Sequence, residues 1–124
     1  ASYIFEVMAK EIRVSRITSL DASCPSSPAA ALSMVHPVNG NITYSLSDNA
    51  VHRTVNGTDT VLSSNTVDFT RLQFCISGTS VDDQKQPRIT LMAGLKSSKY
   101  RGKALPQEVT VDIQTTLSQR FLSN

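Results

Sequence analysis

The fold expected for this chain is decided by residues 38–58, VNGNITYSLSDNAVHRTVNGT. Apolar and polar side chains alternate in residues 42–46 and again in residues 51–55, which is the period of a half-buried β-strand. Three turn signals accompany these strands: Asn39-Gly40, Asp48-Asn49 and Asn56-Gly57. Asn-Gly is the strongest short hairpin signal, so the stretch predicts an antiparallel meander with tight turns.

The same alternation returns on the C-terminal side of the meander. Residues 66–77 predict a strand whose alternation slips by one position at Thr70-Arg71, which indicates a β-bulge or a bend. Residues 89–95 and 109–113 predict two further strands. We therefore expect a β-sheet region over residues 30–124.

On the N-terminal side, residues 1–18, ASYIFEVMAKEIRVSRIT, predict an amphipathic helix. Its apolar arc consists of Ile4, Phe5, Met8 and Ile12, widened by Val7 and Val14. No cap residue precedes the helix, so we expect it to continue upstream of Ala1 in a longer protein. Residues 19–29 are rich in Ser and Pro and predict an irregular connection. The expected fold is α+β, one domain over residues 1–124 with the helix packed on an antiparallel sheet.

The composition excludes several classes of protein. A chain of 124 residues is long enough for one domain with a single core. The net charge of +2 is too small for a general nucleic-acid or membrane-surface protein. No apolar run approaches the roughly 18–20 residues of a membrane span.

Cys24 and Cys75 are the only cysteines. Two thiols without a CxxC spacing or a nearby His cannot form a closed zinc site, which leaves a disulfide or two buried free thiols. We favour the disulfide, which would join the helix exit to a strand and belongs to an oxidising compartment.

The residues that catalysis requires are not arranged in any recognisable motif. His36 and His52 have no metal-ligand spacing and are expected to be ordinary sheet residues. No nucleophile, phosphate or dinucleotide motif occurs, so no enzymatic activity and no cofactor or metal is predicted. Asp82-Asp83 lacks the spacing of a calcium loop and predicts a solvated acidic turn. The glycosylation patterns at Asn41 and Asn56 are explained by turn chemistry.

The helix followed by a meander resembles the heads of type IV pilins and type II secretion pseudopilins. The run IFEVMAKEIRVSRI (residues 4–17) looks like the segment that follows the membrane part of a pilin helix. Residues 42–78 are similar to minor pseudopilins of the secretion protein J kind and to prepilin-type methylation-domain proteins. The shared elements are Val51–Gly57, Leu62–Asn65, Val67–Phe74, QPRITLMAGL (86–95) and VTVDIQTTLSQR (109–120). The Gly-Phe-Thr-Leu-x-Glu peptidase site of prepilins is not present in this chain.

The resemblance implies a structural function, that of a minor pilin or pseudopilin in a type IV pilus or a type II secretion-like filament. The implied partners are other pilin subunits and, through an upstream helix, the inner membrane; the head would be exported to the cell surface. No small-molecule substrate is implied. The helix residues expected to form the core or the assembly face are Ile4, Phe5, Val7, Met8, Ile12 and Val14. Most of this face should be core, which leaves Val7 and Val14 for filament packing.

A basic stretch without acidic residues lies between Gln84 and Gln107. A basic loop with one aromatic side chain is typical of sequence-tolerant DNA contacts, and some minor pilins bind DNA in natural transformation. The DNA contacts expected on this hypothesis are Lys96, Lys99, Tyr100, Arg101 and Lys103. The alternative is a solvated loop that keeps an edge strand from pairing with other sheets. An adhesive pilus-tip domain is a third hypothesis, although the chain offers few aromatic residues for it.

Overall fold

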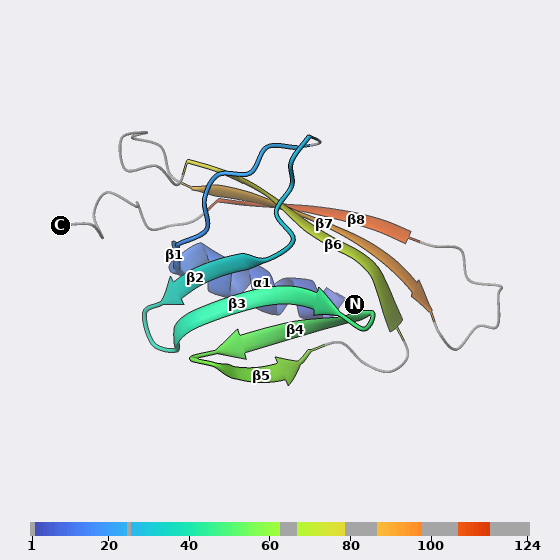
Figure 1. Ribbon diagram of the computed structural model, residues 1–124, viewed down its shortest axis with the longest axis horizontal. Helices are drawn as coiled ribbons and strands as arrows, with labels where there is room; N and C mark the ends of the chain where they lie inside the picture. The colour runs from blue at the N-terminus through green and yellow to red at the C-terminus, as the bar shows by residue number, and fades with distance from the viewer. Residues whose placement is uncertain (1, 25, 63–66, 79–86, 98–106, 115–124) are drawn as a thin grey trace.

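The computed structural model describes residues 2–24, 26–62, 67–78, 87–97 and 107–114. Within these residues the chain forms one helix and eight strands (Figure 1). The elements are α1 Ser2–Val14, β1 Arg16–Ile17, β2 Leu32–His36, β3 Gly40–Ser47, β4 Ala50–Val55, β5 Thr58–Val61, β6 Val67–Ser77, β7 Arg88–Ser97 and β8 Gln107–Gln114.

The first five strands form an antiparallel sheet in chain order, β1-β2-β3-β4-β5. The register of β3 and β4 places Tyr44 opposite Arg53, so both side chains lie on the same face of the sheet. Positive φ angles occur at the turn residues Gly40, Asp48, Asn49, Asn56 and Gly57. The structure thus confirms the strands and turns that residues 38–58 predict.

The last three strands form a second antiparallel sheet in the order β6-β7-β8. The pairing of β6 with β7 shifts register between Phe69 and Arg71, which confirms that the strand is irregular at the predicted position. The other edge of β6 is met by the 19–29 connection. Two isolated antiparallel bridges make this contact, Ala22 with Ile76 and Ala29 with Phe74. Their backbone hydrogen bonds measure 2.8 or 2.9 Å.

The expected fold class, an α+β pilin-like domain with a helix packed on one antiparallel sheet, is wrong. The described chain is predominantly β, with two antiparallel sheets and a helix of 13 residues. The meander ends at β5. All residues of β5 are exposed, so a strand paired with its outer edge would not continue a buried apolar face. Instead β6 buries Phe69, Leu72 and Phe74 from another side of the core and pairs with β7. Figure 1 shows the three-stranded sheet crossing above the five-stranded one, with α1 behind β2 and β3.

The helix ends at Val14, before the predicted end near Thr18. The hydroxyl of Ser15 donates a hydrogen bond of 2.6 Å to a carbonyl oxygen in the last helical turn. Arg16 and Ile17 then form β1 and pair with β2. The side chain of Ile17 is fully buried in this position, which favours the strand over another turn of helix.

One apolar cluster joins the two sheets and the helix. Its largest fully buried side chains are Tyr44, Phe69, Phe74, Met8, Ile12, Ile17, Leu32, Met34, Ile42, Ile89, Leu91 and Ile113. Full burial of such a side chain contributes roughly 1.5–3 kcal/mol. The cluster draws on α1 and on strands of both sheets, so neither sheet has a separate core.

A disulfide joins Cys24 to Cys75, with 5.6 Å between the two Cα atoms. Cys24 lies in the connection after β1, and Cys75 lies in β6. Of the two states considered for these residues, the disulfide is therefore the one observed, and it ties the connection to the edge of β6 beside the two bridges.

Candidate functional site

The helix presents a buried side and an exposed side. The six residues of the predicted core or assembly face divide between them: Ile4, Met8 and Ile12 are buried, Phe5 and Val7 are half-buried, and Val14 is 38% exposed. Tyr3, which the sequence patterns did not single out, is 69% exposed. The buried members are core residues, and the assembly role of the others stays a prediction.

The carboxylate of Glu11 fastens the helix to the five-stranded sheet. Arg53 of β4 makes a bidentate ion pair with this carboxylate. Its Nε donates to Oε1 at 2.9 Å, and its Nη2 donates to Oε2 at 2.5 Å. The hydroxyl of Tyr44 on β3 also donates to Oε1. Asn39 Nδ2 donates to Oε2 at 3.4 Å from the β2–β3 turn. The side chain of Glu11 is only 12% exposed, so a largely buried charge has a complete set of donors.

The surroundings shift the ionisation of all three groups in this Glu11 cluster. Burial by itself would raise the pKa of Glu11, but the hydrogen bonds and charge of Arg53 and the Tyr44 hydroxyl outweigh it and lower that pKa. Burial, together with the bond to Glu11, raises the pKa of Tyr44. The bond to Glu11 raises the pKa of Arg53 against the opposing effect of burial. The cluster therefore stays as carboxylate, neutral phenol and guanidinium around neutral pH.

The Glu11 cluster was not predicted, although the sequence held a signal for it. Arg53 alternates with Val51 and Val55, so it had to point toward the core face of β4. A buried arginine requires an acidic partner, and Glu11 stands beside Ile12 on the helix. All described members of the cluster are satisfied by each other, which indicates a structural role in positioning α1.

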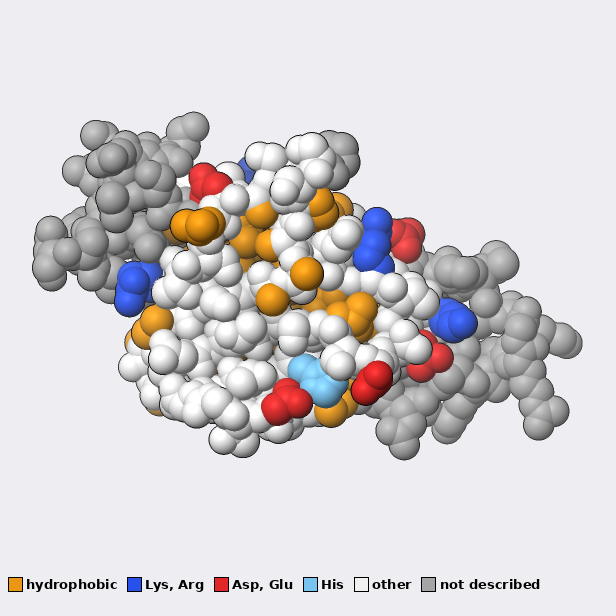
Figure 2. All heavy atoms as spheres, viewed as in Figure 1, with side chains coloured by type: hydrophobic (Ala, Val, Ile, Leu, Met, Phe, Trp, Pro, Cys, Tyr) orange, Lys and Arg blue, Asp and Glu red, His pale blue; other side chains and the backbone are white. Residues whose placement is uncertain are grey.

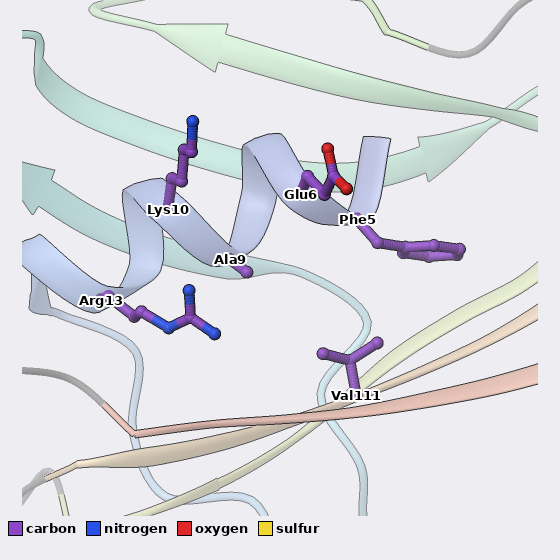
Figure 3. A pocket seen from close by; sticks show the side chains of 6 residues that line it. All are labelled: Phe5, Glu6, Ala9, Lys10, Arg13 and Val111. Carbon is purple, nitrogen blue, oxygen red and sulfur yellow. The ribbon is translucent and has the colours of Figure 1, made fainter. Parts of the chain in front are cut away.

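A groove lies between α1 and β8 on the other side of the helix (Figure 3). Its lining residues are Phe5, Glu6, Ala9, Lys10, Arg13 and Val111, and its volume is about 270 Å³. Figure 3 shows Val111 pointing from β8 toward the helix, Arg13 extending along the side of the helix nearer to Val111, and Lys10 pointing away from Val111. Phe5 also contacts Phe69 edge-on, with 6.1 Å between ring centroids. The groove therefore has an apolar floor and a rim that carries two basic residues and one acidic residue.

The two histidines have hydrogen-bonding roles in the five-stranded sheet. His36 Nδ1 accepts hydrogen bonds of 3.1 Å from the backbone N–H groups of Val38 and Asn39, which shapes the β2–β3 turn. His52 Nδ1 lies 2.8 Å from a carboxylate oxygen of Asp59. In the described ranges, no three His, Cys, Asp or Glu side chains gather closely enough to hold a metal ion.

The predicted DNA contacts fall mostly outside the described residues. This is so for Lys99, Tyr100, Arg101 and Lys103, as it is for Asp82-Asp83. Lys96 is exposed on β7, where its register partner on β6 is Asp68. Figure 2 shows few charged side chains over the five-stranded sheet, so the described residues on this face form no broad basic patch. DNA binding stays a prediction, because Lys96 is the one expected contact of the five that lies in the described residues.

Comparison with protein-family models, with curated proteins and with solved structures gives no match. Among the described residues, no helix combines the length and the apolar character needed to cross a lipid bilayer.

Proposed function

We propose that this chain is a structural minor subunit of a type IV pilus or a type II secretion-like filament and assembles with other subunits through α1. The observation that carries the proposal is the division of the helix. One side of α1 is buried in the core, and the other exposes Tyr3 and flanks the open apolar groove. Exposed aromatic side chains are frequent anchors of protein interfaces.

The division of the helix modifies the assembly face that the sequence predicted. Ile4, Met8 and Ile12 are committed to the core, so they are not available to a neighbouring subunit. Tyr3 and Val14 are the exposed apolar residues of the helix, and they lie near its two ends. A partner helix would therefore contact α1 along the exposed side between these positions.

An extracytoplasmic location is part of the proposal. Its support is the Cys24–Cys75 disulfide, because disulfides persist in oxidising compartments and are rare in the cytosol. A cell-surface filament meets this condition.

Photo-crosslinking in the cells that encode this protein tests the proposal. A photoreactive amino acid is placed at Tyr3 in the native full-length gene, and the crosslinked products are identified by mass spectrometry. We expect products that contain pilin-class subunits, because Tyr3 would face them in the filament. A matched probe at Ser26, exposed in the connection between β1 and β2, should give no such product.

Two results would count against the proposal. Crosslinks from Tyr3 only to unrelated proteins would exclude a filament subunit. Equal yields of pilin-class products from Tyr3 and Ser26 would exclude assembly through the helix.

A further inference from the structure

Each sheet has an edge strand that pairs with nothing else in the described part of the chain. β8 is the last strand of the three-stranded sheet, and β5 is the last strand of the five-stranded sheet. The outer edge of β6, by contrast, is met by the bridges from Ala22 and Ala29. The free backbone N–H and C=O groups of β8 and β5 are templates for pairing with another strand.

The free edge of β8 adjoins the groove beside α1. Val111 lines the groove from β8, while Phe5 and Ala9 line it from the helix (Figure 3). Side chains alternate across a strand, so a strand added to β8 would direct every second side chain to the same face as Val111. The groove would then receive an apolar side chain, and Lys10 on its rim would favour a nearby carboxylate.

β5 has the two side chains that this site would take, one apolar and one acidic. Its register with β4 places Asp59 and Val61 on one face and Thr58 and Thr60 on the other. The side chain of Val61 is 52% exposed, so it is available to a partner. The side chain of Asp59 is 53% exposed despite its contact with His52. β5 therefore presents one apolar and one acidic side chain, two residues apart, on the same face.

We propose that β5 of one copy of this chain pairs with β8 of a second copy, with Val61 in the groove and Asp59 near Lys10. The opposite face of the joined sheet then sets Thr58 and Thr60 beside the acidic residues of β8. These two residues, Glu108 and Asp112, are exposed and share the face that points away from the groove. Threonine beside a carboxylate introduces no like-charge repulsion.

Pairing of β8 with a second β8 is less favourable than this arrangement. It would bring two copies of Asp112 onto one face of the joined sheet, where like charges repel each other, while each Glu108 is already paired with Arg71. Because β5 and β8 are different surfaces, their contact is head-to-tail and continues from copy to copy instead of closing into a dimer. The inference rests on the proposed function, since such a contact belongs between neighbouring subunits of a filament.

Thiol crosslinking of the full chain tests the pairing. Thr60→Cys and Thr110→Cys are both exposed positions on the face away from the groove, and the native cysteines are already joined in a disulfide. The two purified variants are mixed at high concentration with a short bismaleimide, because a four-residue strand makes a weak contact. We expect a covalent dimer in the mixture and a ladder of oligomers from the Thr60→Cys/Thr110→Cys double variant.

Matched variants make the test specific. Thr18→Cys, at the opposite edge of the five-stranded sheet, should not crosslink to Thr110→Cys. Adding Val61→Lys should lower the dimer yield by roughly tenfold, because it places a cation against Lys10 and Arg13, whereas Val61→Thr should lower it less. Dimers from Thr110→Cys alone, equal yields with Thr18→Cys, or no dimer at all would each overturn the pairing.

The outcomes separate this inference from the proposed function. Crosslinks from Tyr3 to pilin-class subunits without a Thr60–Thr110 product would leave the function standing and exclude the strand pairing. A Thr60–Thr110 product without Tyr3 crosslinks would establish the strand pairing and exclude helix-mediated assembly.

Discussion

The two sheets are held to the N-terminal part of the chain by different chemistry. The five-stranded sheet is joined to α1 by the Glu11 cluster, whose hydrogen bonds are directional. The three-stranded sheet is joined to the connection by a disulfide and two backbone bridges, and to α1 by the Phe5–Phe69 contact beside an open groove.

The Glu11 cluster sets the orientation of α1, whereas the disulfide and the apolar contact only keep the three-stranded sheet attached. A bidentate arginine–carboxylate pair requires a specific geometry, so it fixes the rotation of the helix over the five-stranded sheet. An apolar contact is tolerant of small displacements, and a disulfide limits separation without setting the fit of side chains. The side of α1 that faces β8 is therefore held less rigidly than the side that faces the five-stranded sheet.

The largest effect is expected from removing the covalent link. Cys24→Ser/Cys75→Ser should lower the free energy of unfolding by about 4 kcal/mol, because the bond closes a loop with a sequence separation of 51 residues. Urea unfolding followed by circular dichroism measures the loss, and reduction of the wild type should reproduce it. An unchanged midpoint would show that the bridges alone hold the connection to β6.

The next largest effect is expected at the Glu11 cluster. Arg53→Met should cost roughly 3 kcal/mol in the same unfolding experiment, because it leaves the carboxylate of Glu11 without its main partner. The Glu11→Gln/Arg53→Met double variant is the control and should recover part of the loss, since no unpaired charge remains. A double variant as unstable as the sum of both single variants would show that the pair acts only through packing.

A smaller effect is expected on the groove side of the helix. Phe5→Ala should cost roughly 2 kcal/mol, because the ring is half-buried and loses its edge-on contact with Phe69. Tyr3→Ala is the matched control, and its mostly exposed ring should change the unfolding free energy by less than about 0.5 kcal/mol. Equal costs at the two positions would remove the distinction between the faces of α1.

The smallest effect is expected from pH, through the Glu11 cluster. The pKa of Glu11 is lowered in the folded state, so its contribution is present above the ordinary value of 4.5 and is lost as the pH falls below it. The pKa of Tyr44 is raised, so its contribution is present below the ordinary value of 10.0 and is lost as the pH rises above it. Unfolding free energies across this range should fall at both ends.

Arg53→Met is the control for the pH experiment. Without the guanidinium, burial is opposed only by the Tyr44 bond and the His36 charge, so the pKa of Glu11 is lowered less and the loss of stability at acid pH should shrink. Persistence of the full acid loss in this variant would assign it to other carboxylates.

Local features of the fold were accessible from the sequence because each has a local cause. The alternation in residues 42–46 and the Asn56-Gly57 turn depend on neighbouring residues, and so does the slip at Thr70-Arg71. The division into two sheets was not accessible, because alternation shows which side chains share a face and not which strands pair. The fold class was therefore wrong although individual strands were right.

The candidate site was less predictable than the strands. Helical periodicity identified Ile4, Met8 and Ile12 as one apolar arc, but it could not show that the core takes all three and leaves Tyr3 exposed. The groove depends on Val111, which is distant in sequence and reaches α1 only through the packing of β8. Its two basic rim residues look like an ordinary solvated helix face in the sequence alone.

The disulfide also determines what happens to this protein when its backbone is cut. β2, β3, β4 and β5 lie between Cys24 and Cys75, so the bond makes a covalent ring that contains most of the five-stranded sheet. One break in a turn of this ring, such as Asp48-Asn49, opens the ring without releasing either part of the chain. A chain nicked there by a protease would keep its helix and its last three strands on one molecule.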